Sequence, residues 1–156
     1  MQLKADEMIA DSRAALAALR ARKDVSGKVG AMGFCIGGHM TYLTACENDV
    51  AAAASFYGGG IAAPQGPGGQ ASTIGRTGKI QGRILCLFGG KDAFIPMDQV
   101  DAIRDAFAKA KTRSEVVVYP DADHGFFCDQ RASYQEKAAS DAWTRVKKLF
   151  REELQA

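Results

Sequence analysis

The feature that most constrains this chain is the pentapeptide Gly33-Phe34-Cys35-Ile36-Gly37, which directly follows an apolar run at residues 28–32. A strand that ends in Gly-x-nucleophile-x-Gly and turns at once into a helix presents the central side chain at the carboxyl end of the strand. Small flanking residues are expected because the backbone of the nucleophile is strained and a neighbouring Cβ would clash. The motif therefore predicts a strand–turn–helix unit with Cys35 at its tip.

Apolar strands and helices alternate along the rest of the chain. Continuously apolar strands separated by helices indicate a parallel sheet covered on both faces. We therefore expect an α/β fold, a three-layer sandwich with a mostly parallel sheet of about four strands, in one domain at residues 1–156. In the last helix Trp143, Val146, Leu149 and Phe150 are expected to face the core. The expected strands are 28–33, 49–56, 83–88 and 115–119, and the expected helices are 5–21, 36–46, 97–110 and 133–154.

Composition excludes several classes of partner. The 20 Lys and Arg residues nearly balance the 18 Asp and Glu residues, which argues against nucleic acid or an anionic membrane surface as a partner. No apolar stretch approaches the roughly 20 residues that span a bilayer. The charged segment 1–7 lacks the apolar core of a secretion signal, so a cytoplasmic location is expected. The four cysteines show no Cys-x-x-Cys pairing, so no metal site is expected.

Two further reactive side chains follow predicted strands. Asp92 comes after the third strand and His124 after the fourth, so the order along the chain is nucleophile, acid, histidine. Parallel strands place their carboxyl ends at one edge of the sheet, so we expect Cys35, Asp92 and His124 to lie together. There an imidazole can take the thiol proton, and a carboxylate can hold the imidazole in the required tautomer.

Other titratable residues have structural interpretations. Asp121 and Asp123 are rivals to Asp92, but as sequence neighbours of His124 they are interpreted as shaping its loop. His39, one turn beyond Cys35 on the expected helix, is interpreted as a buried structural residue. The remaining cysteines, at positions 46, 86 and 128, are interpreted as packing residues.

Three segments, at residues 33–38, 88–96 and 123–126, together resemble the signature segments of the dienelactone hydrolase family. The resemblance runs from about residue 5 onward, and it implies an α/β-hydrolase-like fold. It also implies Cys35 as nucleophile, Asp92 as acid and His124 as base in the hydrolysis of lactones or other small carboxylic esters. The acyl group would pass through a thioester on the cysteine, with no cofactor.

The resemblance suggests further contacts around the substrate. The backbone N–H of Ile36, the residue after the nucleophile, is expected to be one oxyanion-hole donor. Tyr57 and Phe126 are candidates for substrate contact. An arginine that typical members use to hold a substrate carboxylate falls here at Cys128, which favours simpler esters. Two arginines, Arg76 and Arg131, are other possible anion contacts.

The chain matches only the C-terminal part of family members. The missing part would supply the first strands of the sheet and the second oxyanion donor, whose loss costs about a hundred- to a thousandfold in rate. Without those strands, residues 28–33 would form an exposed apolar edge, which invites pairing with another chain. We therefore predict a homodimer or higher oligomer that buries this edge or the face of the first helix. The alternative is that the helix at 5–21 covers the edge itself.

The sequence is also compatible with two other functions. One is a catalytically weak fragment or minimal domain with a role in binding or assembly. The other is a redox-responsive thiol protein, in which Cys35 is reactive but transfers no acyl group.

Overall fold

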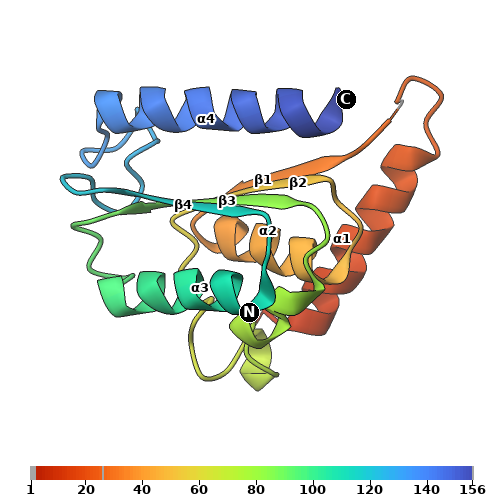
Figure 1. The fold of residues 1–156 in the computed structure, drawn as a ribbon, viewed down its shortest axis with the longest axis horizontal. Helices are drawn as coiled ribbons and strands as arrows, with labels where there is room; N and C mark the ends of the chain where they lie inside the picture. The colour runs from red at the N-terminus through yellow and green to blue at the C-terminus, as the bar shows by residue number, and fades with distance from the viewer. Residues whose placement is uncertain (1–2, 26, 156) are drawn as a thin grey trace.

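The computed structural model describes residues 3–25 and 27–155. A parallel sheet of four strands lies between two layers of helices (Figure 1). The elements in chain order are α1 (Ala5–Arg20), β1 (Gly30–Phe34), α2 (Ile36–Glu47), β2 (Ala52–Phe56), η1 (Pro67–Gly69), η2 (Ile74–Lys79), β3 (Arg83–Gly89), α3 (Met97–Ala110), β4 (Ser114–Tyr119) and α4 (Glu136–Leu154). The predicted α/β fold is confirmed. The ends of the predicted domain, residues 1, 2 and 156, lie outside the described residues, and its extent stays a prediction.

The strands lie side by side in chain order, β1-β2-β3-β4, and each neighbouring pair is parallel. Parallel neighbours need a crossover connection, which α2, the segment carrying η1 and η2, and α3 supply in turn. Figure 1 shows α2 and α3 on one face of the sheet and α4 on the other. All four strands therefore end at the same edge, where parallel sheets build their sites.

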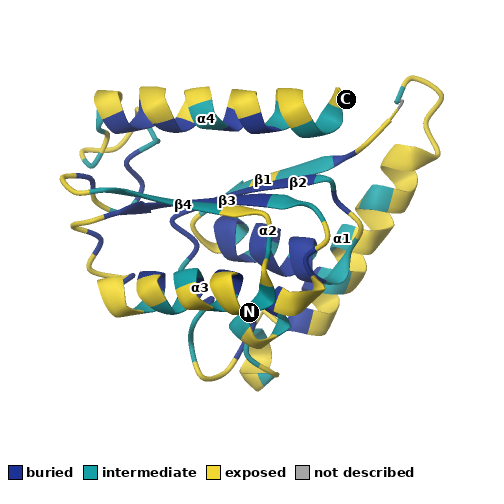
Figure 2. Cartoon of the chain, viewed as in Figure 1, coloured by how far each residue is buried: buried dark blue, intermediate teal, exposed yellow. Residues whose placement is uncertain are grey.

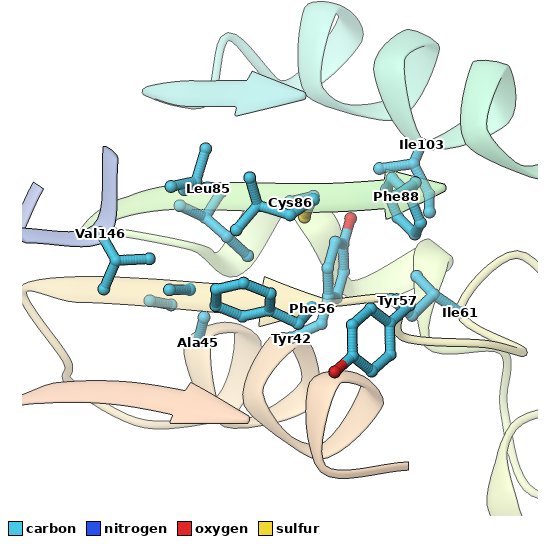
Figure 3. Packing of buried hydrophobic residues seen from close by; sticks show 14 of the residues in the cluster. Tyr42, Ala45, Phe56, Tyr57, Ile61, Leu85, Cys86, Phe88, Ile103 and Val146 are labelled. Carbon is cyan, nitrogen blue, oxygen red and sulfur yellow. The ribbon is translucent and has the colours of Figure 1, made fainter. Parts of the chain in front are cut away.

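The core is centred on β2 and β3, whose residues are almost all buried (Figures 2 and 3). Close packing of α2 on β2 depends on Gly38, because a Cβ there would overlap the carbonyl oxygen of Phe56. Ser55 Oγ also donates a hydrogen bond to the carbonyl of Gly38 (2.9 Å). The end of β2 is thereby fixed against the first turn of α2.

One expectation for α4 is wrong. Val146 and Leu149 are buried as predicted, whereas the side chain of Trp143 is 42% exposed. Trp143 lies beside Met32 of β1 in a shared surface groove, and β1 is the last strand of the sheet on that side. The indole is exposed because, within residues 3–25 and 27–155, no further strand lies beyond β1 to pack against it.

The outer edge of β1 is open in the described part of the chain, since β1 pairs only with β2. The first helix does not cover this edge: α1 packs onto α2 through Ala5, Met8 and Leu43. Between α1 and β1 runs a groove of about 540 Å³. Among the described helices, none has the length and apolar character needed to cross a membrane.

Candidate active site

Cys35 occupies a strained turn between β1 and α2. Its backbone has φ 56° and ψ −121°, a conformation that a residue with a side chain rarely adopts. Gly33 makes room for the turn, because a Cβ there would overlap the carbonyl oxygen of Gly37. The Cys35 N–H donates to the carbonyl of Phe56 at 3.0 Å, so the turn is tied to the end of β2. The thiol is exposed.

Asp92 and His124 are joined directly. Asp92 follows β3 with its side chain fully buried, and its Oδ2 accepts a hydrogen bond from His124 Nδ1 at 2.8 Å. Its Oδ1 accepts from the backbone N–H of Phe94 at 2.9 Å. A buried carboxylate needs such partners. An ionised carboxylate can only accept hydrogen bonds, so His124 Nδ1 is the donor in this pair. The neutral imidazole then has its lone pair on Nε2, where it can act as a base.

The two rival aspartates do not contact the imidazole. Asp121 forms an exposed ion pair with Lys91 at 3.0 Å. Asp123 accepts a hydrogen bond from the backbone N–H of His124. Both therefore act on the loop that carries the histidine, in agreement with their interpretation from the sequence.

A cavity of about 500 Å³ opens beside Cys35. Tyr57 forms part of its wall and also lies against the imidazole of His124, with ring centroids 5.0 Å apart. Like Cys35, Tyr57 has a positive φ, of 37°. Burial raises the pKa of Tyr57 to about 12, so the phenol keeps its proton at neutral pH. The remaining lining residues are Phe34, Gly125, Phe127, Cys128, Asp129 and Arg131.

The structure does not bring the predicted thiol and imidazole into a hydrogen bond: Cys35 Sγ forms none with His124 or with any other described residue. Ile36 is the first residue of α2, and its N–H likewise has no acceptor among the described residues. An unpaired N–H at a helix N-terminus is suited to stabilise negative charge.

Phe126 lies elsewhere than expected. It is fully buried and packs edge-on against Tyr57, with ring centroids 5.3 Å apart, while its neighbour Phe127 lines the cavity. Figure 3 shows the ring of Tyr57 at the end of the core, with its hydroxyl directed away from Ile61. Phe126 therefore does not line the cavity. It affects the cavity only by fixing the position of the Tyr57 ring.

The two arginines considered as anion contacts differ in their surroundings. Arg76 is paired with Glu47 at 2.8 Å, at the end of α2 opposite to Cys35. Arg131 lines the cavity and forms no ion pair with any residue in the described part of the chain. Within residues 3–25 and 27–155, no group of three or more His, Cys, Asp or Glu side chains is placed to hold a metal ion.

Some residues around the site had no signal in the sequence. Phe94 is 77% exposed, and its ring lies edge-on to the imidazole of His124, with ring centroids 5.5 Å apart. Cys128 lines the same cavity as Cys35, although its interpretation from the residues alone was packing. The family resemblance places Cys128 where typical members have a substrate-binding arginine, and its place on the cavity wall agrees with that position.

Comparison with known proteins extends over nearly the whole chain. The chain is 44% identical over 155 residues to a Synechocystis protein assigned as a carboxymethylenebutenolidase, covering 98% of this chain and 62% of that protein. An Escherichia coli protein so assigned is 34% identical over 120 residues, covering 77% of this chain and 44% of its own length. The chain thus spans less than two thirds of the length of these relatives.

Solved structures with a similar fold include proteins of the same kind. A Klebsiella pneumoniae protein assigned as a dienelactone hydrolase superposes with a TM-score of 0.84 and 34% identity, over 91% of this chain and 59% of that one. A dienelactone hydrolase-like promiscuous phosphotriesterase from metagenomic libraries superposes with a TM-score of 0.79 and 28% identity, over 94% of this chain and 62% of that one. The model of the dienelactone hydrolase family matches residues 1–154, and the resemblance noted in the sequence is confirmed: the chain belongs to this family.

Proposed function

We propose that this chain hydrolyses small carboxylic esters or lactones, with Cys35 as nucleophile, His124 as base and Asp92 as the acid that orients it. The observation that carries the proposal is the buried Asp92–His124 pair, joined at 2.8 Å at the same sheet edge as the strained Cys35 turn. Family membership supports the same reaction class. No metal or organic cofactor enters the proposed reaction.

The first half of the reaction transfers the acyl group to the protein. Cys35 Sγ attacks the carbonyl carbon while the thiol proton passes to His124 Nε2. His124 then donates this proton to the departing alcohol oxygen, and the acyl group remains on sulfur as a thioester. We expect the thiol–imidazole contact to tighten with substrate in place, as catalytic hydrogen bonds often do.

The second half restores the thiol. His124 takes a proton from a water molecule, which attacks the thioester carbonyl. The carboxylic acid leaves as the carbon–sulfur bond breaks, and the imidazolium returns its proton to Cys35. Asp92 stabilises the imidazolium in both halves through the Nδ1 hydrogen bond.

Two donors near the nucleophile fit the oxyanion that forms in each half. The unpaired N–H of Ile36 stands at the N-terminus of α2, next to Cys35 in the chain. The Tyr57 hydroxyl has no hydrogen-bond partner among the described residues, and its residue lines the same cavity. Tyr57 is therefore our candidate for contact with the substrate. Phe126 packs against the Tyr57 ring and holds it in place.

The cavity wall suggests the form of the substrate. Phe34, Tyr57 and Phe127 give it an aromatic surface, and Arg131 adds a cation that forms no ion pair with the residues the structure describes. An ester with a small apolar acyl group would pack against the rings. A carboxylate on the substrate would form an ion pair with Arg131. Typical family members have their arginine at another position, which Cys128 occupies in this chain.

We also propose that the chain self-associates through the open edge of β1, as the sequence led us to expect. The support is the unpaired edge itself and the exposure of Met32 at its centre, which is 40% exposed. An open apolar edge is a template for pairing with another strand.

The reaction is tested with p-nitrophenyl acetate and single substitutions. Cys35→Ala and His124→Ala should each lower turnover by roughly a thousandfold or more, since members of a triad act as one unit. In the unmodified protein we expect a burst of nitrophenol followed by slower turnover, because thioester hydrolysis follows a faster acylation. Cys35→Ser keeps a nucleophile that needs stronger help from the base, so it should retain only a small part of the activity.

The matched control is Cys46→Ala, which removes a buried thiol on α2 away from the cavity lining. It should turn over the ester at the unmodified rate. Turnover that survives both Cys35→Ala and His124→Ala unchanged would contradict the triad.

A further inference from the structure

A second thiol shares the cavity with the candidate nucleophile. Cys35 and Cys128 both line it, although they lie 93 positions apart in the chain. Each cysteine directly follows a phenylalanine, and these two rings, of Phe34 and Phe127, stack with their centroids 5.3 Å apart. The stacking holds the end of β1 against the connection between β4 and α4. Each cysteine is the next residue after one of the two stacked rings.

The other two cysteines are unsuited to thiol chemistry. Cys46 is 4% exposed, and burial raises its pKa to about 12. Cys86 is fully buried in β3, and burial raises its pKa further still. The thiolate is the reactive form of cysteine, so both are held in their inert state. Of the four cysteines, only the pair in the cavity is open to a reagent from solvent.

Two charged side chains line the cavity beside the pair, and Cys35 also lies at a helix N-terminus. Cys35 stands at the N-terminus of α2, the positive end of the helix dipole. Arg131 lines the same cavity without an ion pair among the described residues. Asp129 is the opposing charge on this wall and is exposed. Tyr57 adds no charge at neutral pH, since its phenol stays protonated.

We propose that Cys35 and Cys128 form a peroxide-responsive pair, which closes to an intramolecular disulfide and so blocks the nucleophile reversibly. The Cys35 thiolate attacks the O–O bond of a hydroperoxide: an S–O bond forms, the O–O bond breaks, and the departing oxygen takes a proton to give water or an alcohol. Cys35 is thereby oxidised to the sulfenic acid. Cys128 sulfur then attacks Cys35 sulfur, the S–O bond breaks, and water leaves with the Cys128 proton.

The position of Cys128 suits a resolving thiol. It lies between β4 and α4, in a connection made of turns without a regular strand or helix. Such a segment can adjust its backbone to the Cα separation of about 5.5–6 Å that a disulfide prefers. A dithiol reductant would reopen the bond by exchange and return both thiols. The pair would thus protect Cys35 from further, irreversible oxidation.

The test follows the protein after treatment with stoichiometric hydrogen peroxide. Intact mass should fall by two hydrogen atoms, and a digest without reductant should contain a peptide that joins Cys35 to Cys128. Esterase activity should be lost with the same time course and return on addition of dithiothreitol. The mass and the linked peptide are read without any assay of turnover, so they test the pair even if the proposed ester hydrolysis fails.

Two variants serve as controls. Cys128→Ala should gain oxygen on Cys35 instead of losing hydrogen. With excess peroxide its Cys35 should go on to the sulfinic acid, so that dithiothreitol no longer restores activity, whereas the unmodified protein should recover. Cys46→Ala should behave as the unmodified protein. Oxidised protein that carries only oxygen adducts, or links Cys35 to Cys46, Cys86 or another molecule, would overturn the proposal.

Discussion

Gly33 and Gly37 stand at equal distances along the chain from Cys35, but the fold treats them differently. A Cβ on Gly33 would approach the backbone of Gly37 more closely than the 3.0 Å that real Cβ atoms keep. A Cβ on Gly37 would meet nothing within 4 Å. The sequence suggested that both glycines are needed for space. That expectation is right for Gly33 and wrong for Gly37.

This contrast predicts opposite effects of one added methyl group. Gly33→Ala should lower the free energy of unfolding by about 3 kcal/mol, because the clash involves backbone that cannot rotate away. Gly37→Ala should leave it unchanged or raise it by up to about 1 kcal/mol, since alanine is the better helix residue. Urea unfolding of the two variants measures the difference. Equal losses would show that the strained turn at Cys35, and not the space beside Gly33, sets the requirement for glycine.

At the scale of elements, His39 connects α2 to the long segment between β2 and β3. Its ring nitrogens are hydrogen-bonded to the carbonyl of Gly59 (2.8 Å) and to Thr73 Oγ1 (2.7 Å). The ring is buried, and its burial lowers the pKa of His39 below its usual 6.5. The folded protein therefore holds His39 neutral, as a structural tie.

This tie makes stability depend on pH. Below pH 6.5 the unfolded chain protonates His39 before the folded protein does, so stability falls as the pH drops from there toward the lower folded pKa. The slope for one proton is at most about 1.4 kcal/mol per pH unit. His39→Gln cannot titrate, so its stability should change less between pH ~7 and ~5 than that of the unmodified protein.

The control is His124→Gln, which removes the only other histidine of the chain. It should keep the pH dependence that His39 causes. Unfolding is followed by urea titration at each pH. A His39→Gln slope equal to that of the unmodified protein would show that other groups carry the dependence.

The elements themselves were largely predictable. The four strands and the four long helices begin and end within three residues of their expected positions. Continuous apolar runs bounded by glycine or proline specify such strands locally. The partners of His39 could not be predicted, since Thr73 lies 34 residues away and meets the ring only in the folded chain.

The candidate site likewise has residues that could be predicted from the sequence and residues that could not. Strand ends in chain order led to Asp92 and His124, which the structure joins at 2.8 Å, because parallel strands share one edge. The role of Cys35 beside them stays a prediction. The exposure of Trp143 was not predicted, since the helix pattern marks an apolar face but does not show which part of that face the sheet covers. The resemblance pointed to Cys128 and Arg131 as residues near the substrate, and both line the cavity. Their exact placement depends on an irregular connection, which has no periodicity to read.

At the scale of the whole molecule, the asymmetry of the sheet is the main feature. β4 ends one side and β1 the other, and β1 carries a groove on each of its faces. The groove against α1 is lined without a single charged residue. Residues 29–34 also contain no lysine or proline, which are the residues that usually protect a free edge. A second copy of the same uncharged edge can pair with it without repulsion.

Self-association through β1 is tested by two matched substitutions. Met32 on β1 and Met97 on α3 are 40% and 39% exposed, so lysine at either position adds one charge to a similar surface. Multi-angle light scattering at micromolar concentration should give a dimer for the unmodified protein and for Met97→Lys, but a monomer for Met32→Lys, because a buried unpaired charge opposes edge pairing. A monomeric unmodified protein would refute self-association. Loss of the dimer in Met97→Lys alone would place the interface at α3 instead of β1.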